Sequence, residues 1–143
     1  MFIGHFQTNF DNTKGRTAMP VIFRKSIGVK AIITKGYENS LIMVSIEEWQ
    51  QIVGQVSTGN FLSSMQRQTD RFLLGNAFEV EFDSQGRFII PLKLREHAKL
   101  GKEILFVGVG NRIEIWDRLV WEKNDLYLNE NIEKISQQIS EQS

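Results

Sequence analysis

The chain contains an internal duplication that begins with a short turn sequence. Residues 10–16 read FDNTKGR, and residues 82–87 read FDSQGR. Beyond these turns, residues recur at a constant offset of 71, in the pairs Arg16 and Arg87, Pro20 and Pro91, and Arg24 and Arg95. Each copy has only about 40 to 45 residues, near the size at which a separate hydrophobic core becomes marginal. We therefore expect the two copies to pack together.

Aromatic and β-branched residues alternate with other residues before both turns, as is typical of β-strands. The alternating residues are Phe6, Thr8 and Phe10 in the first copy, and Phe78, Val80 and Phe82 in the second. Gly15 and Gly86 suit a tight connection with positive φ, and the polar side chains before them can bond backbone amides in the turn. Those side chains belong to Asp11, Asn12, Asp83 and Ser84.

A short helix and a second hairpin follow each turn. Pro20 and Pro91 are suited to the start of a helix, because the missing N–H is not needed there, and they predict helices over VIFRKSI and LKLREHAKL. Two apolar runs separated by Gly and Asn then predict a hairpin in each copy. The runs are KAIITKG and NSLIMV in the first copy, and EILFVGVG and NRIEIW in the second.

Helices are also predicted between and after the copies. Ser45 and Glu48 form a capping-box pattern, Asp117 is the equivalent cap before RLVWEKN, and the segment NFLSSMQRQTDRFLLG indicates a connecting helix. The sequence thus predicts an α+β fold with a first copy at 1–55, a connecting helix at 56–76, a second copy at 77–121, and a C-terminal helix or tail at 122–143.

The charges are neutral in sum but unevenly distributed. Lys and Arg together number 17, as do Asp and Glu. Residues 14–35 carry six cations and no acid, residues 83–102 have a net charge of +3, and the tail from residue 122 has a net charge of −3. A basic region on a chain with an acidic tail favours a local phosphate-binding surface.

Several ordered motifs resemble the MraZ family of bacterial transcriptional regulators. They are MFIG, KGR, FRKSI, RFLLGNAFEVEFDSQGRFIIPLKLREHA and EILFVGVGNRIEIWD, and they run from Met1 to about Trp121. The resemblance implies a tandem pair of AbrB-like swapped-hairpin β-barrel domains that assemble into a ring. It also implies binding to double-stranded DNA at short G-rich direct repeats, and regulation of the chain's own operon of division and cell-wall genes.

The family's DNA-contacting signature is an Asp and an Arg separated by three residues. Asp83 and Arg87 satisfy it in the second copy. In the first copy, Asp11 and Arg16 are separated by four residues, so either the turn has one extra residue or Asn12 takes the place of the aspartate. The remaining predicted DNA-binding residues are Lys14, Gly15, Arg24 and Lys25.

Each predicted contact has a structural alternative. Arg16 is expected to read guanine, and lysines to pair with phosphates. Arg87 is expected either to contact DNA or to serve the contacts between subunits of the ring. Arg24 and Arg95 follow a proline at helical spacing, which also favours bracing of the short helix against a neighbouring copy. Surface arginines in turns commonly pair with nearby acids instead.

Other functions find little support in the sequence. The chain has no cysteine, which excludes a disulfide framework, a thiolate metal site and a cysteine nucleophile. His5 and His97 lack ligand spacing, GVGN at 108–111 favours a hairpin bend, and no residues pair a nucleophile with a base. We therefore expect no enzyme activity, metal, cofactor or small-molecule substrate.

The same features suggest where the protein acts and what else it could be. The start of the chain lacks the pattern of a signal peptide, and no apolar run reaches membrane-spanning length. We expect a cytoplasmic, nucleoid-associated protein. The alternatives are an antitoxin-like protein of the AbrB fold and a ring-forming scaffold that binds proteins alone.

Overall fold

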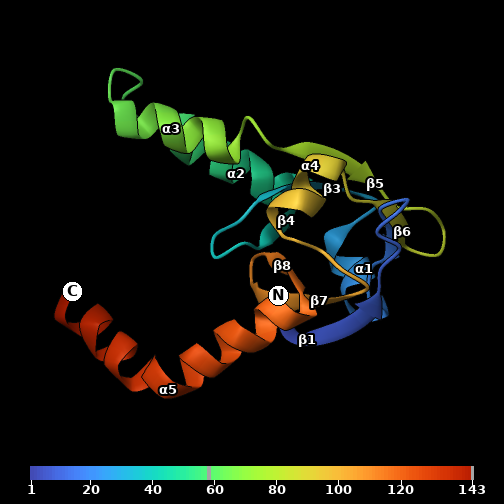
Figure 1. Cartoon of the computed structure of the whole chain (residues 1–143). Coiled ribbons are helices and arrows are strands. Elements are labelled where there is room, and N and C mark those ends of the chain that lie inside the picture. Colours follow the sequence, from blue (N-terminus) through green and yellow to red (C-terminus); the bar gives the residue numbers. More distant parts are fainter. Residues whose placement is uncertain (58, 143) are drawn as a thin grey trace.

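The computed structural model describes residues 1–57 and 59–142, which form an α+β fold (Figure 1). Its elements in chain order are β1 (Phe2–Asn9), β2 (Arg16–Ala18), α1 (Val21–Ile27), β3 (Lys30–Lys35), β4 (Leu41–Ser45), α2 (Ile46–Ser57), α3 (Ser64–Leu73), β5 (Phe78–Glu81), β6 (Arg87–Ile89), α4 (Leu92–His97), β7 (Glu103–Gly110), β8 (Ile113–Asp117) and α5 (Arg118–Gln142).

The two copies share one antiparallel sheet of six strands, in the order β1-β7-β8-β4-β3-β5. Each predicted hairpin is present, as β3 with β4 and as β7 with β8. The first strand of each copy pairs with the hairpin of the other copy: β1 pairs with β7, and β5 pairs with β3. Each copy therefore supplies an edge strand that pairs with the other copy's hairpin, and the expected packing of the copies is confirmed.

A second, smaller sheet joins the strands that follow the two turns. In this ribbon β2 pairs with β6, and Thr17 lies opposite Phe88. Both of these residues are buried. The core beneath the ribbon contains residues from both copies, including Phe23, Phe88 and Phe106. Burial of these large apolar side chains in one cluster makes the two copies a single packed unit.

The short helices begin where the prolines predict. Pro20 precedes α1 with φ −53°, and Pro91 precedes α4 with φ −56°. The second helix is shorter than the predicted LKLREHAKL segment, because Lys99 adopts φ 54° and the amide of Leu100 bonds the carbonyl of Arg95. A left-handed residue followed by such a bond is a common way to end a helix.

The longer helices form two arms that extend from the sheet, on the side away from the turns (Figure 1). The hydroxyl of Ser45 accepts a hydrogen bond from the amide of Glu48 at 3.1 Å, as the capping-box pattern predicts. α3 begins after Ser63, whose hydroxyl caps the amide of Gln66, and it occupies the middle of the predicted connecting segment.

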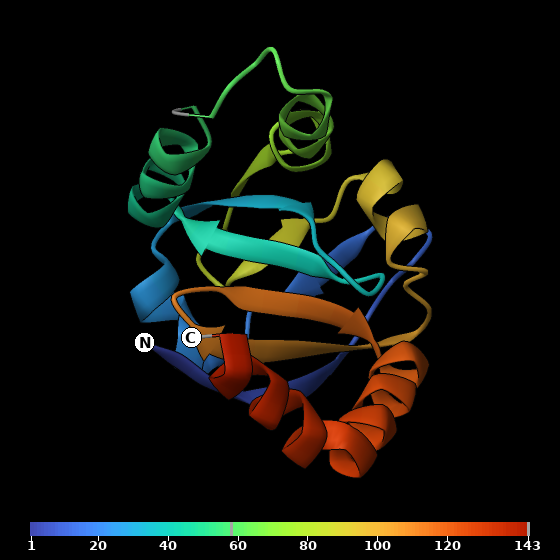
Figure 2. The same ribbon diagram turned by 90° about the vertical axis from the view of Figure 1, so that its left-hand side faces the viewer.

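The second arm is one continuous helix. Asp117 caps it by accepting a hydrogen bond from the amide of Leu119, and the predicted helix after Asp117 runs on without a break into the acidic tail. Viewed from the arm side, α2 and α3 lie on one side of the strands and α5 on the other (Figure 2). In the described part of the chain, no helix combines the length and apolar character needed to cross a membrane.

Candidate nucleic-acid interface

Asp11 organises the first turn. Its amide bonds the carbonyl of Arg16, and its own carbonyl accepts hydrogen bonds from the amides of Gly15 and Arg16. Its carboxylate Oδ1 accepts from the amides of Thr13 and Lys14, at 3.0 and 3.2 Å. Gly15 has φ +73°, the left-handed conformation that glycine adopts most readily.

Asp83 organises the second turn in the same way. Its amide bonds the carbonyl of Arg87, and its carbonyl accepts a hydrogen bond from the amide of Gly86, which has φ +76°. Its Oδ1 accepts from the amides of Gln85 and Arg87. Asp11 and Asp83 are therefore equivalent, and the first turn carries one extra residue. Asn12 does not take the place of the aspartate.

The two turn arginines differ in their surroundings. Arg87 Nε donates to Asp83 Oδ2 at 2.6 Å, in an ion pair whose side chains are 51% and 40% exposed. Hydrogen bonds from the amide and the side chain of Arg87 lower the pKa of Asp83 below its ordinary value of 3.8. Arg16 is exposed, and within residues 1–57 and 59–142 no group forms a hydrogen bond or ion pair with its side chain.

The ribbon brings both arginines onto one surface. In the register of β2 and β6, Arg16 lies opposite Ile89 and Ala18 lies opposite Arg87. Because side chains two positions apart on a strand point to the same face, Arg16 and Arg87 both lie on the outer face. They line one open groove, whose other residues include Glu79 and Glu81 of the edge strand β5.

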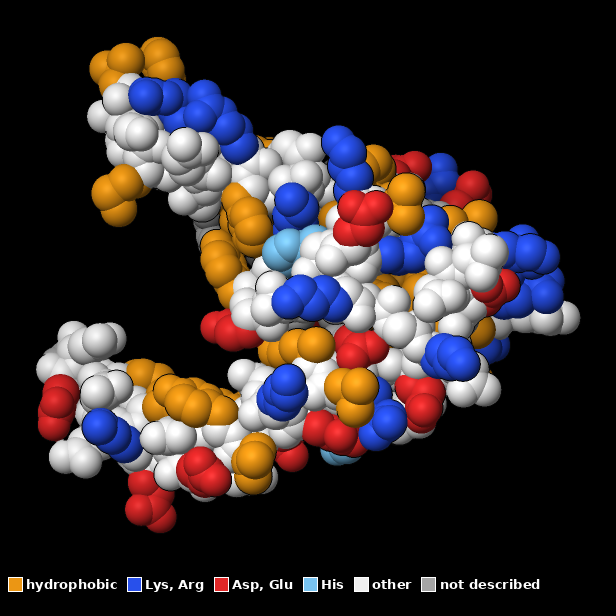
Figure 3. All heavy atoms as spheres, viewed as in Figure 1, with side chains coloured by type: hydrophobic (Ala, Val, Ile, Leu, Met, Phe, Trp, Pro, Cys, Tyr) orange, Lys and Arg blue, Asp and Glu red, His pale blue; other side chains and the backbone are white. Residues whose placement is uncertain are grey.

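The predicted lysines lie at the same end of the molecule. Lys14 is exposed in the first turn, and Lys25 is exposed on α1, where it lines a groove between that helix and the second turn. Figure 3 shows Lys and Arg side chains gathered over the turn end, and hydrophobic side chains exposed along both arms. Whether these lysines contact phosphate stays a prediction.

Arg24 and Arg95 each lie across the turn of the other copy. A Cβ built on Gly86 would lie 2.4 Å from Arg24 Nε, and one built on Gly15 would lie 2.7 Å from Arg95 Cζ. Arg24 Nε also donates to the carbonyl of Met19 at 2.9 Å. The structure thus gives Arg24 an internal contact, and its predicted contact with phosphate remains untested.

The sequence prediction missed the acidic side of the groove. Glu79 and Glu81 lie on β5, both exposed, and Lys30 Nζ lies 4.0 Å from Glu79 Oε2. The alternation of FEVE with Val80 buried was visible in the sequence and would have placed both glutamates outward. Their position beside the arginines was not visible, because it depends on which strand pairs with which.

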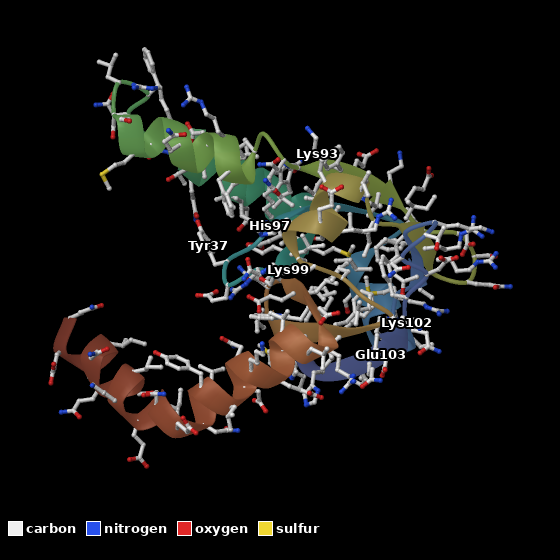
Figure 4. The ribbon with its side chains drawn as sticks, viewed as in Figure 1. Tyr37, Lys93, His97, Lys99, Lys102 and Glu103 are labelled. Carbon is white, nitrogen blue, oxygen red and sulfur yellow. The ribbon has the colours of Figure 1, made fainter. Side chains whose placement is uncertain are left out.

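The remaining candidates have structural roles. His97 Nε2 lies 3.1 Å from the carbonyl of Gly36, and its ring contacts Phe72, which stacks on Tyr37. Figure 4 shows His97 and Lys93 on α4, with Tyr37 on the turn between β3 and β4. His5 lies against the ring of Trp121. No three His, Cys, Asp or Glu side chains in the described ranges form a group that could hold a metal.

The chain is therefore a duplicated α+β unit that presents two arginines beside neighbouring turns. A family model with the description "MraZ protein" matches the chain twice, over residues 1–72 and 73–142, and its description includes the words "antitoxin-like". The chain belongs to the MraZ family, as the resemblance of its motifs predicts.

Curated relatives match almost the whole chain, and each is named "Transcriptional regulator MraZ". A protein of Thermoanaerobacter sp. strain X514 is 38% identical over 99% of this chain and 98% of its own length. One from Acetivibrio thermocellus is 39% identical over 98% and 97%, and one from Alkaliphilus oremlandii is 40% identical over 99% and 98%. These are names of regulators and not of enzymes, in agreement with the expectation that the chain is not an enzyme.

Proposed function

We propose that this protein is a sequence-specific DNA-binding transcription regulator that reads G-rich direct repeats through its two turn arginines. The observation that carries the proposal is the placement of Arg16 and Arg87 on one exposed face of the ribbon. The names of the relatives support the regulatory role. The proposal includes the cytoplasm and nucleoid as the place of action, and the chain's own operon of division and cell-wall genes as the target.

The turn arginines are suited to the guanine edge in the major groove. A guanidinium can donate two parallel hydrogen bonds to guanine O6 and N7, which is worth about 1–3 kcal/mol of discrimination. Arg87 uses Nε for Asp83 and keeps both Nη groups for a base. Arg16 has all its donors available within the part of the chain that the structure describes.

Charges around the arginines determine the direction from which DNA approaches. Lys14 and Lys25 lie on the turn side and would pair with phosphates, which positions the protein without reading sequence. Glu79 and Glu81 line the same groove from the edge strand and would repel phosphates. The duplex therefore approaches from the turn end, opposite the helical arms.

The finer fold and assembly belong to the same proposal. The exchange of β1 and β5 between the copies supports an AbrB-like swapped-hairpin barrel. Exposed apolar residues on the arms support contact with further copies of the chain in a ring, and they include Phe61, Leu62, Met65, Leu126, Tyr127 and Ile139. A ring that offers several turns to several repeats gains affinity by effective concentration.

The test is a gel shift and an anisotropy titration with the DNA upstream of the chain's own gene. We expect sharp retardation of G-rich repeats, weaker binding to a scrambled duplex, and a steep loss of affinity with added salt. Arg16→Ala combined with Arg87→Ala should abolish the preference, while Lys134→Ala on α5 should preserve it. An antitoxin without this operator, or a protein scaffold, would show no preference for the upstream DNA, and the proposal would then be wrong.

A further inference from the structure

Two arginines occupy equivalent positions over the two turn glycines, and each belongs to the other copy. Arg95, on α4 of the second copy, lies over Gly15: a Cβ there would be 2.7 Å from Arg95 Cζ and 2.8 Å from its Nε. Arg95 Nη1 also donates to the carbonyl of Asn12 at 3.0 Å. The guanidinium therefore covers the glycine and bonds the backbone of the first turn.

Arg24 likewise lies over the glycine of the second turn, but its Nε hydrogen bond goes to Met19 of its own copy. A Cβ on Gly86 would lie 2.4 Å from Arg24 Nε, 2.9 Å from Cζ and 3.0 Å from Cδ. Its Nε is fixed by the carbonyl of Met19, and the amide of Met19 in turn bonds the carbonyl of Gly86 at 2.8 Å. Arg24 and the second turn are thus held together through one residue of the first copy.

The backbone repeats this crossed arrangement on the other side, where the amide of Ile90 donates to the carbonyl of Gly15 at 2.8 Å. Both glycines are buried beneath the arginines, and both have positive φ. Glycine is needed at each position for two reasons, the backbone conformation and the space that the guanidinium takes. Neither turn is therefore held by its own copy alone.

We propose that Arg24 and Arg95 are positioning residues that each hold the DNA-reading turn of the other copy. Arg95 positions the turn that presents Arg16, and Arg24 positions the turn that presents Arg87. This inference rests on the proposed function for its consequence at DNA, but the crossed contacts can be tested without DNA. It differs from the prediction that Arg24 binds phosphate directly.

Amide hydrogen exchange tests the crossed contacts in the absence of DNA. In Arg95→Met, we expect the amides of Lys14, Gly15 and Arg16 to exchange about tenfold faster, as suits the loss of one charge-assisted hydrogen bond. The amides of residues 83–87 should not change. In Arg24→Met, the amides of residues 83–87 should exchange faster, by a smaller factor, and those of Lys14, Gly15 and Arg16 should not change. Faster exchange in both turns in each variant, or in neither turn, would overturn the proposal.

A matched control is available on α4. Lys93→Met removes the same charge from an exposed position two residues before Arg95 in the sequence. It should not change exchange in either turn. A thermal melt of each variant shows whether the fold is retained, so that a local effect is separated from global loosening.

A double-mutant cycle then tests the consequence for DNA. Arg95→Met should weaken binding of the G-rich duplex about tenfold in the unmodified chain and cause no further loss when Arg16→Ala is present. The salt dependence should keep its slope, and Arg95→Lys should not restore affinity, because an ammonium lacks the planar fork of a guanidinium. A direct phosphate contact would instead lower the slope by about one, add to Arg16→Ala, and be restored by lysine.

The two proposals fail in different ways. If the unmodified chain shows no preference for upstream DNA, the proposed function is wrong, and the exchange pattern still decides the positioning role. If exchange in the turns is unchanged while Arg16→Ala combined with Arg87→Ala abolishes the preference, the positioning role is wrong and the proposed function stands.

Discussion

Arg87 Nε lies 2.6 Å from Asp83 Oδ2, whereas the carboxylate of Asp11 bonds only backbone amides and leaves Arg16 without such a partner in the described ranges. One extra residue in the first turn accounts for the difference, because it lengthens the path between Asp11 and Arg16. The two turns of the duplicated chain therefore present their arginines differently. Arg87 is oriented by its ion pair with Asp83, and Arg16 has no such ion pair in the described residues.

Asp83→Asn removes the ion pair that orients Arg87 and should lower discrimination between the G-rich and scrambled duplexes. The expected loss is about two- to tenfold, the cost of ordering one long side chain at an interface. Asp11→Asn is the control, since it keeps the amide bonds and breaks no ion pair. If the ratio of affinities for the G-rich and scrambled duplexes is the same for Asp83→Asn and the unmodified chain, the ion pair does not orient Arg87.

The same carboxylate gives a pH dependence with a definite sign. Because the pKa of Asp83 is lowered in the folded chain, its stabilising effect is present above the ordinary value of 3.8 and is lost as the pH falls through the lowered pKa. Carboxyl chemical shifts followed by NMR should give a midpoint for Asp83 below 3.8. Asp83→Asn should reduce the loss of stability in that acid range.

Gly86→Ala should destabilise the fold by about 1–3 kcal/mol, through positive φ and collision with Arg24. Gly54→Ala should have the opposite sign, because a Cβ at this position in α2 meets nothing within 4 Å and alanine favours a helix by about 0.5–1 kcal/mol. Chemical denaturation measures both. Adding Arg24→Ala to Gly86→Ala should recover part of the loss, and no recovery would contradict the crowding of Gly86 by Arg24.

Glu81→Gln should raise affinity for DNA up to about fivefold, because it removes a negative charge from the groove that the two arginines line. The gain should shrink as salt is added. Glu130→Gln on α5 is the control, since it removes the same charge from the arm. A gain of the same size for Glu130→Gln would mean that only net charge matters.

Phe106→Ala should lower the free energy of unfolding by about 3–5 kcal/mol, because Phe106 is fully buried in the core that both copies share. Both copies should still unfold in one transition, since β1 and β5 each pair with the other copy's hairpin. Calorimetry tests this directly. Two separate transitions would show that the copies fold independently.

The local structure could be predicted from the sequence, and the long-range pairing could not. Pro20, Gly15 and the alternation before each turn act on neighbouring residues, so they predict the turns and short helices. Alternation of buried and exposed residues does not determine which strands pair. The pairing of β1 and β5 with the other copy's hairpin could therefore be expected only from the family resemblance. The position of Arg95 over Gly15 follows from that exchange. The sequence held a signal for it, because Gly15 and Gly86 are separated by the same 71 residues as Arg24 and Arg95.

The proposed contact between the first turn and DNA is tested most sharply by the affinity of Arg16→Ala for a duplex with a single G-rich box, measured by anisotropy beside Lys134→Ala. We predict that Arg16→Ala binds about 5- to 150-fold more weakly and shows a smaller preference over a scrambled box, while Lys134→Ala is unchanged. Equal affinity and preference for Arg16→Ala and the unmodified chain would contradict the claim that the first turn reads DNA.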